Sequence, residues 1–318
     1  MGALADAALA AVRDCLGVKA GESVLVLSDP PMERLARAVL EAARSLGAEA
    51  VLLVYPEREL SGQEPPAPAP AAMAAVNVVI AVTSKSITHT AARRAATAAG
   101  ARVATMPGIT EECLVRTMSA DVHAIAARTV RVSGLLTAAS AARVTTARGT
   151  DISIPIAGIT AIASTGLILA PGQWGNLPSG EAYLRPEEGK AAGVIVVDGA
   201  LAGIGMLAEP VRITVEAGMA REISGGAQAR EFASQLERLG PAARTLAELG
   251  VGTNDRAVLT GRILEDEKIL GTVHVALGNN ASMGGTVDIP YHVDGILLRP
   301  TLTLDGEPIL VDGHPTFT

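Results

Sequence analysis

Aromatic residues make up only 2% of this sequence, which also contains just two cysteines and five histidines. With so few rings available, the hydrophobic core must be built mainly from aliphatic side chains. Cys15 and Cys113 lie far apart without the spacing of a metal cluster, which favours two buried, reduced thiols in a cytoplasmic protein. Because histidine is scarce, each histidine inside an apolar segment requires an explanation.

The sequence also lacks long apolar runs and any excess of basic residues. No segment approaches the roughly 18 uninterrupted apolar residues that a membrane span needs, and the first residues lack the basic start of a signal peptide. The 26 basic residues against 33 acidic ones give a net charge of −7, with no concentrated basic stretch to bind phosphates. We therefore expect neither a membrane nor a nucleic-acid partner.

Short apolar runs alternate with amphipathic segments in the first part of the chain. ESVLVLSD and VNVVIAVTS have the length of buried strands, and MERLARAVLEAARSLGA has apolar residues at helical spacing before a glycine. This alternation indicates parallel βαβ units in an open, Rossmann-like α/β sheet. No strand is followed by a glycine-rich nucleotide-binding motif. The proline-rich PPAPAPAA is expected to be a turn or linker.

The character of the sequence changes after about Ser119. The remainder contains many short strand-like runs broken by glycine and asparagine, which predict a strand-rich mixed α+β domain. One clear helix is expected over 226–250, kinked near Pro241, with Glu248 at its C-terminal end. The predicted domains are therefore 1–125, a Rossmann-like α/β domain, and 126–318.

Several acidic and imidazole side chains of the second domain lie in apolar or glycine-bounded positions. They are Glu181, Glu248, His274, His292 and Asp294. Residues two apart on a strand point to the same face, so HVD in DIPYHVDGILLRPTL would present an imidazole and a carboxylate together. Burial of such groups unpaired is costly, and a divalent cation removes that cost. A buried ion pair is the alternative for His292 and Asp294.

Two other polar features have more than one explanation. The acidic run EDEK, at 265–268, is expected to be an exposed turn before a strand. His89 stands at a strand-to-helix junction, where an open α/β sheet places ligands. His89 could equally cap the following helix together with Thr88 and Thr90.

Beyond these patterns, NLPSGEAYLRP, ELGVGTN, ILEDEKILGTVHVALGNN and HVDGILLRPTLTLDGEPILVDG together resemble the thermophilic metallo-aminopeptidase family, which includes aminopeptidases T and S. The resemblance implies two Zn or Co ions held by Glu181, Glu248, His274, His292 and Asp294. It implies catalytic roles for Glu181 and Glu248, one of which would move the proton.

The same resemblance implies a homodimer that acts on a small-molecule or short-peptide substrate. Tyr183 and Asn280 are the expected substrate contacts. A tyrosine that the family has after its first histidine falls on Ala281 here. Its loss would shift the substrate toward small amides or heterocycles.

A second resemblance concerns SKSITHTAARRAATAAGARVATMPG, which looks like the N-terminal domain of the short members of this superfamily. These include the dihydroxypyridine ring-opening dioxygenases, which use one Fe(II) held by two histidines and an aspartate. The resemblance implies that His89 contacts the substrate and that His274, His292 and Asp294 form a facial triad.

Three functions therefore remain open. The principal expectation is hydrolysis of an amide-type bond by a metal-activated water. The first alternative is Fe(II)-dependent cleavage of a hydroxylated N-heteroaromatic ring. The second is a catalytically inactive binding protein of the same fold.

Overall fold

The computed structural model describes residues 2–317, which form two compact units. The first unit comprises the chain up to Ala126 together with Thr165–Ser179. The second comprises Ala127–Ser164 together with the chain from Gly180 onward. We expected a single domain boundary at residue 125. The structure differs, because the later segment Thr165–Ser179 belongs to the first unit.

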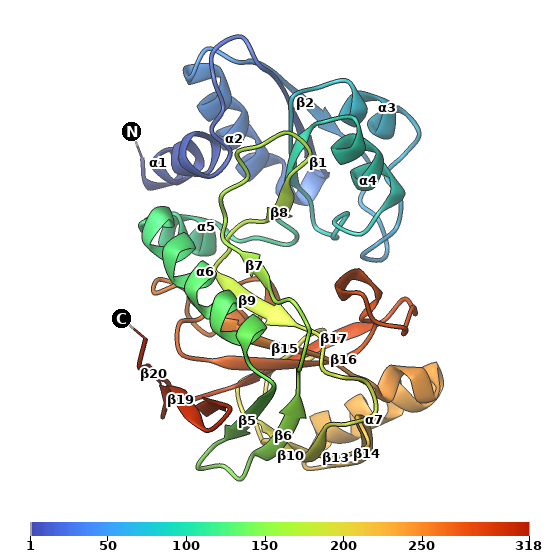
Figure 1. The fold of residues 1–318 in the computed structure, drawn as a ribbon. Coiled ribbons are helices and arrows are strands. Elements are labelled where there is room, and N and C mark those ends of the chain that lie inside the picture. Colours follow the sequence, from blue (N-terminus) through green and yellow to red (C-terminus); the bar gives the residue numbers. More distant parts are fainter. Residues whose placement is uncertain (1, 318) are drawn as a thin grey trace. The chain divides into compact units, whose positions relative to one another are not determined.

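The first unit is built on a five-stranded parallel sheet in the order β2-β1-β3-β4-β8 (Figure 1). Its strands are β1 (Ser23–Ser28), β2 (Glu49–Val54), β3 (Val78–Val82), β4 (Arg102–Thr105) and β8 (Trp174–Asn176). The inner strands are buried almost throughout, as their continuous aliphatic sequences predict. Pairing of β8 with β4 draws the returning segment into this unit. The predicted Rossmann-like parallel sheet is confirmed.

Helices cover both faces of this sheet. They are α1 (Ala3–Ala10), continued by a π-helical turn (Ala11–Cys15), α2 (Glu33–Ser45), preceded by a 3-10 turn (Pro30–Met32), α3 (Pro68–Ala74), α4 (Ala91–Ala98) and α5 (Glu111–Thr117). Figure 1 shows α1 and α2 on one side and α3 and α4 on the other. The expected proline-rich linker is wrong in part, because α3 begins within it; proline is tolerated in the first turn, where the N–H has no helical partner.

The second unit contains two antiparallel sheets that share one hydrophobic core. α6 (Val122–Ala138) leads into it from the first unit. The eight-stranded sheet has the order β14-β13-β10-β6-β5-β18-β19-β20. Its strands are β5 (Ala141–Thr145), β6 (Asp151–Pro155), β10 (Ala192–Val197), β13 (Val211–Glu216), β14 (Met219–Ser224), β18 (Thr301–Leu304), β19 (Glu307–Val311) and β20 (His314–Pro315).

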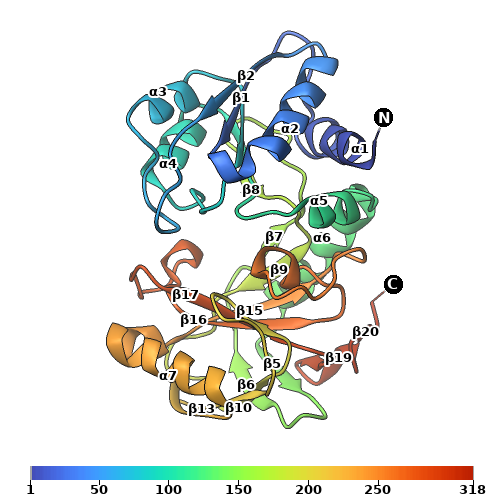
Figure 2. The same cartoon turned by 180° about the vertical axis from the view of Figure 1, so that it is seen from behind.

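The seven-stranded sheet has the order β12-β11-β17-β16-β15-β9-β7. Its strands are β7 (Ile162–Ser164), β9 (Glu181–Leu184), β11 (Ala200–Leu201), β12 (Gly205–Met206), β15 (Leu246–Gly252), β16 (Val273–Gly278) and β17 (His292–Leu297). α7 (Ala227–Leu239) packs against β13 (Figure 2) and also against β14, and α8 (Ile263–Asp266) is a single turn. The predicted strand-rich α+β architecture is confirmed.

The helix expected over 226–250 ends early. α7 stops at Gly240, which has a φ of 85°, and Pro241 then begins a short 3-10 turn. A positive φ is readily adopted by glycine and ends a helix. The following residues LAELGVG form the wholly buried strand β15. Our prediction that Glu248 ends a helix is therefore wrong, because it lies on a strand.

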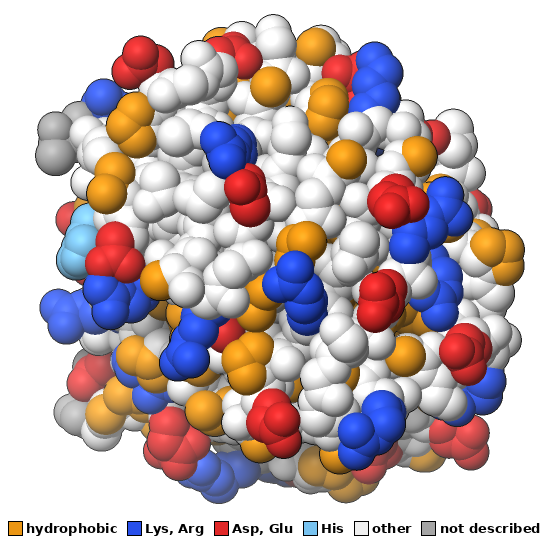
Figure 3. Space-filling model, turned by 90° about the horizontal axis from the view of Figure 1, so that it is seen from below, with side chains coloured by type: hydrophobic (Ala, Val, Ile, Leu, Met, Phe, Trp, Pro, Cys, Tyr) orange, Lys and Arg blue, Asp and Glu red, His pale blue; other side chains and the backbone are white. Residues whose placement is uncertain are grey.

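No helix in the described part of the chain combines the length and the apolarity needed to cross a bilayer. Figure 3 shows one face of the molecule, on which basic and acidic side chains are interspersed rather than gathered by sign.

Candidate metal centre

One face of the seven-stranded sheet carries all the predicted ligands. They are Glu181 on β9, Glu248 on β15, His274 on β16, and His292 and Asp294 on β17. Neighbouring residues along a strand point to opposite faces. The intervening Leu249, Val275 and Val293 accordingly belong to the hydrophobic core. The alternation of polar and apolar residues that predicted these strands therefore also places the predicted ligands on one face of the sheet.

Glycines on β15 leave space beside these side chains. Gly250 pairs with His274, and a Cβ atom on Gly250 would lie 1.9 Å from His274 Nε2. A Cβ atom on Gly252 would lie 2.1 Å from the carbonyl oxygen of Ile269. The sequence ELGVG thus supplies one carboxylate and two positions at which other groups approach the bare backbone.

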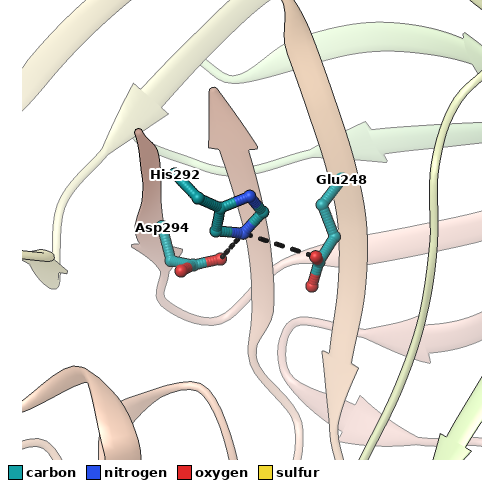
Figure 4. A group of neighbouring side chains, drawn as sticks. All are labelled: Glu248, His292 and Asp294. Carbon is teal, nitrogen blue, oxygen red and sulfur yellow. Dashed lines mark ion pairs between the residues drawn. The ribbon is translucent and has the colours of Figure 1, made fainter. Parts of the chain in front are cut away.

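Glu248, His292 and Asp294 form a close cluster, with one potential ligand atom from each within 4.8 Å of the other two (Figure 4). His292 Nε2 lies 3.4 Å from Asp294 Oδ1 and 3.5 Å from Glu248 Oε2. The other oxygen of Glu248 lies 3.2 Å from His274 Nε2. The Glu248 carboxylate therefore links both imidazoles.

The backbone fixes the orientation of the His292 ring. Its Nδ1 lies 2.8 Å from the carbonyl oxygen of Asn279, an acceptor, so Nδ1 must carry the proton and donate. The other nitrogen, Nε2, then faces Glu248 and Asp294. Metal-binding histidines commonly donate their second N–H to a carbonyl or carboxylate in this way.

Two buried polar atoms on the same face have no hydrogen-bond partner among the described residues, namely Glu181 Oε2 and His274 Nδ1. Glu181 Oε2 faces His274 Nε2 at 3.5 Å, which is too long for a strong hydrogen bond. An unpaired buried polar atom is costly. Both atoms therefore mark the ligand-bearing face as a place where charged groups are incompletely paired within the described residues.

The sequence interpretation missed Lys268 and Glu267. The run EDEK is not an exposed turn, because α8 and the residues after it fold back so that Ile269 forms a bridge with Asn254. Lys268 is fully buried, its Nζ lies 2.6 Å from Glu181 Oε1, and it also pairs with Glu267. The available signal was a charged run directly before a buried strand, in the most specific segment of the family resemblance.

The carboxylates of this centre favour the protonated forms of its two imidazoles by raising their pKa values. Burial opposes protonation of His274, but its hydrogen bond with Glu248 raises the pKa to about 9. Burial likewise opposes protonation of His292, but Asp294 raises its pKa to about 10. Burial raises the pKa of Glu248. A divalent cation would displace these protons, because ligating imidazoles must be neutral.

The predicted substrate contacts in this unit differ in their surroundings. Tyr183 lies on the ligand-bearing face, paired with Gly250, and burial raises the pKa of its hydroxyl. Asn280 is fully buried; its Nδ2 donates to Glu188 and its Oδ1 accepts from the Val287 amide. The structure thus gives Asn280 a role in holding a loop, and a substrate contact stays a prediction.

Ala281 stands where the resembled family has a tyrosine. It begins a 3-10 turn (Ala281–Met283) and offers only a methyl group. Tyr291, immediately before β17, has a buried hydroxyl without a hydrogen-bond partner among the described residues.

His89 belongs to the first unit, between β3 and α4. Thr90 is the residue that caps α4, because its hydroxyl oxygen accepts from the Arg93 amide. The His89 ring meets Trp174 edge-on at 6.1 Å between centroids, and the Arg93 guanidinium lies 3.9 Å from the Trp174 ring centroid. A substrate contact for His89 stays a prediction.

The residues of this centre fit a divalent cation. Imidazole with carboxylate suits several transition metals, and two histidines with one carboxylate form the facial triad of Fe(II) oxygenases. Additional carboxylates also suit dinuclear hydrolytic sites. The donor atoms alone accommodate either chemistry.

Comparisons with known proteins bear on these two possibilities. A sequence model of the NicX family, 2,5-dihydroxypyridine 5,6-dioxygenase, matches residues 4–316. The 2,5-dihydroxypyridine 5,6-dioxygenase of Pseudomonas putida strain KT2440 is 25% identical over 199 residues. The aligned stretch covers 58% of this chain and 57% of that relative, which is less than two thirds of its length.

Two solved structures share the fold. The 2,5-dihydroxypyridine dioxygenase of Pseudomonas putida KT2440 has a TM-score of 0.85 at 21% identity, covering 99% of this chain and 97% of that chain. Wild-type AmpT from Thermus thermophilus has a TM-score of 0.73 at 19% identity, covering 99% of both chains. Both resemblances suggested by the sequence are present, and that to the dioxygenases is the stronger. The comparisons therefore favour the ring-cleaving alternative over the amide hydrolysis that we expected first.

Proposed function

We propose a function from the premise that the chain belongs to the 2,5-dihydroxypyridine 5,6-dioxygenase family: it opens a hydroxylated pyridine ring with dioxygen and one Fe(II) ion. The family description implies cleavage of the bond between ring carbons 5 and 6, with both oxygen atoms entering the product. The substrate class is a small, planar N-heteroaromatic with hydroxyl groups that can approach a metal ion.

The family match carries this proposal, and a set of two histidines and one carboxylate on the ligand-bearing face is compatible with it. His274, His292 and Asp294 supply two imidazoles and one carboxylate from the paired strands β16 and β17. This combination holds Fe(II) in oxygenases and leaves coordination positions open. Strand pairing fixes the spacing of these side chains, since Gly278 faces His292 and Ala276 faces Asp294. Both partners are small and leave the face open.

Bound Fe(II) would supply the redox chemistry that dioxygen needs to react with an aromatic ring. The chain would orient the donors, since the Asn279 carbonyl keeps His292 Nε2 turned toward Asp294. Glu248, whose carboxylate contacts both imidazoles, would take up the proton that a ring hydroxyl loses on binding. Tyr183, which has a raised pKa, keeps its proton and can donate a hydrogen bond to a ring oxygen.

Amide hydrolysis with two metal ions is the second candidate. The fold likeness to AmpT and the extra carboxylates of Glu181 and Glu248 favour it. Such enzymes activate a water between two ions. Lys268 stands against it, because its ammonium group already binds Glu181 Oε1 at 2.6 Å.

Oxygen consumption tests the proposal. Protein loaded with Fe(II) under argon is mixed with aerated 2,5-dihydroxypyridine, while an electrode follows oxygen and absorbance follows the ring. We expect equimolar loss of oxygen and substrate. His292→Ala should abolish turnover, because it removes a ligand, whereas His314→Ala on the exposed end of β20 should leave it unchanged.

The other outcomes are equally specific. Cleavage of aminoacyl anilides by the Zn- or Co-loaded protein, without oxygen uptake, would replace the proposal with the hydrolase. Tight binding of hydroxypyridine without turnover under any metal would identify a binding protein instead.

A further inference from the structure

Lys268 is a charged side chain to which the proposed ring cleavage assigns no role. It is fully buried, although a lysine is almost never fully buried unless it is paired. Its Nζ lies 2.6 Å from Glu181 Oε1, and a second ion pair joins it to Glu267. Burial alone would lower the pKa of Lys268, but Glu181 and Glu267 raise it above its ordinary value.

The backbone fixes this ammonium group in place. The Lys268 carbonyl oxygen accepts from the Asn254 amide at 2.8 Å, and the Lys268 amide donates to the Glu265 carbonyl at 2.9 Å. The segment can approach β15 closely because Gly252 has no side chain. Backbone hydrogen bonds therefore hold Lys268 in the interior of the candidate metal centre.

A sequence of polar contacts connects the ammonium group with the metal cluster. Glu181 binds Lys268 through Oε1 and faces His274 Nε2 with Oε2 at 3.5 Å. His274 in turn contacts Glu248, which contacts His292. One carboxylate, that of Glu181, thus separates the fixed positive charge from the imidazoles.

The position beside Glu181 is where a second metal ion would have to bind. Of the other carboxylates, Glu248 and Asp294 are already gathered around His292, and Glu267 pairs with Lys268. A second divalent ion that used Glu181 would lie next to a fixed ammonium group inside a buried site. Repulsion between cations is large where water does not screen it.

We propose that the ammonium group of Lys268 takes the place of a second metal ion beside Glu181 and so limits this centre to one divalent ion. Lys268 is then a positioning residue that also decides how many ions bind. This inference rests on the proposed function, because it supplies the physical reason for a one-ion centre.

Metal stoichiometry, measured without turnover, tests the inference. The full-length protein, its Lys268→Met variant and its Lys268→Gln variant are dialysed against Mn(II), and bound metal is determined by elemental analysis. Parallel EPR spectra show whether two Mn(II) ions lie close enough to couple. We expect about one ion per chain in the unchanged protein and about two coupled ions in both variants.

Two variants are used so that the test does not depend on the folding of either one. Lys268→Gln keeps a hydrogen-bond donor beside Glu181, whereas Lys268→Met removes charge and polarity together. Lys190→Met is the matched control, because Lys190 is exposed and its ion pair among the described residues is with Glu187. It should bind the same amount of Mn(II) as the unchanged protein.

Two results would overturn the inference: two ions in the unchanged protein, or one ion in a folded Lys268 variant. Neither result depends on ring cleavage. A protein that fails to consume oxygen but changes from one to two Mn(II) ions on loss of Lys268 would refute the proposed function and uphold this inference.

Discussion

At the scale of single residues, a missing side chain determines where an imidazole lies. His274 fills the space above Gly250, and the contact is so close that even a methyl group would overlap its ring. His274 must occupy this position to contact both Glu181 and Glu248. The glycine is therefore as much a part of the centre as the residues with donor atoms.

Gly250→Ala should weaken metal binding while the sheet still forms. The new Cβ would displace the His274 ring, and loss of a correctly oriented ligand costs about 10- to 100-fold in metal affinity. Titration of the variant with Mn(II) measures the change. Gly134→Ala is the control, because Gly134 lies on an exposed part of α6 with no atom near a new Cβ. Equal affinity in both variants would contradict this role for Gly250.

Residue-level prediction from the sequence worked where local spacing decides the outcome. Alternation along HVDGIL is enough to place His292 and Asp294 on one face of a strand. It failed for Lys268, because charges are ordinarily solvated and its partner Glu181 lies 87 residues away in the chain. No local pattern reports a contact of that kind.

At the scale of elements, the loop between β16 and β17 determines how His292 enters the centre. Glu188 holds this loop from the turn after β9: its carboxylate accepts from the Thr286 amide, the Thr286 hydroxyl and Asn280 Nδ2. The hydrogen bonds with Thr286 lower the pKa of Glu188. The same loop presents the Asn279 carbonyl that orients His292.

Glu188→Gln should loosen this loop. The amide cannot accept all three hydrogen bonds, and loss of a hydrogen bond to a charged group costs about 1.5–3 kcal/mol. We expect faster amide exchange over residues 279–290 and severalfold weaker Mn(II) binding. Glu187→Gln is the adjacent control, because Glu187 pairs with the exposed Lys190 and, among the described residues, forms no hydrogen bond to the loop over residues 279–290. Unchanged exchange in the Glu188 variant would show that the loop is held by other contacts.

Helices and strands could be predicted from the sequence where the spacing of apolar residues keeps one period. The first unit repeats strand and helix with glycine at the boundaries, so most of its parallel sheet follows from the sequence. The helix expected up to Gly250 was wrong because apolar residues continue across Gly240 and Pro241, which end the helix by backbone geometry. β8 is too short to be recognised, and its pairing with β4 is a long-range contact.

At the scale of the whole molecule, stability depends jointly on protons and metal. The pKa values of His274 and His292 are raised from about 6.5 to about 9 and about 10. Their protonated forms therefore stabilise the metal-free fold fully below about pH 6.5, and this contribution is lost as pH rises through the higher values. Metal binding needs the neutral imidazoles, so its dependence on pH has the opposite sign.

The stabilisation that metal provides should therefore increase with pH. We expect the difference in melting temperature between Mn(II)-saturated and metal-free protein to be larger at about pH 9 than at about pH 6. Differential scanning calorimetry at both values measures it. In His292→Ala the difference should be smaller and depend less on pH. A difference that is constant with pH would mean that these imidazoles are not the ligands.

The return of residues 165–179 to the first unit has a consequence for how the chain matures. Asn176 follows Thr105, its partner in the parallel sheet, by 71 residues. A ribosome therefore releases most of the first unit long before its last strand exists, and β4 must wait with an unpaired edge that could recruit another chain. A fragment cut at residue 126 would keep that edge permanently. The two units are thus interleaved during synthesis, and neither can be produced intact as one continuous piece of the chain.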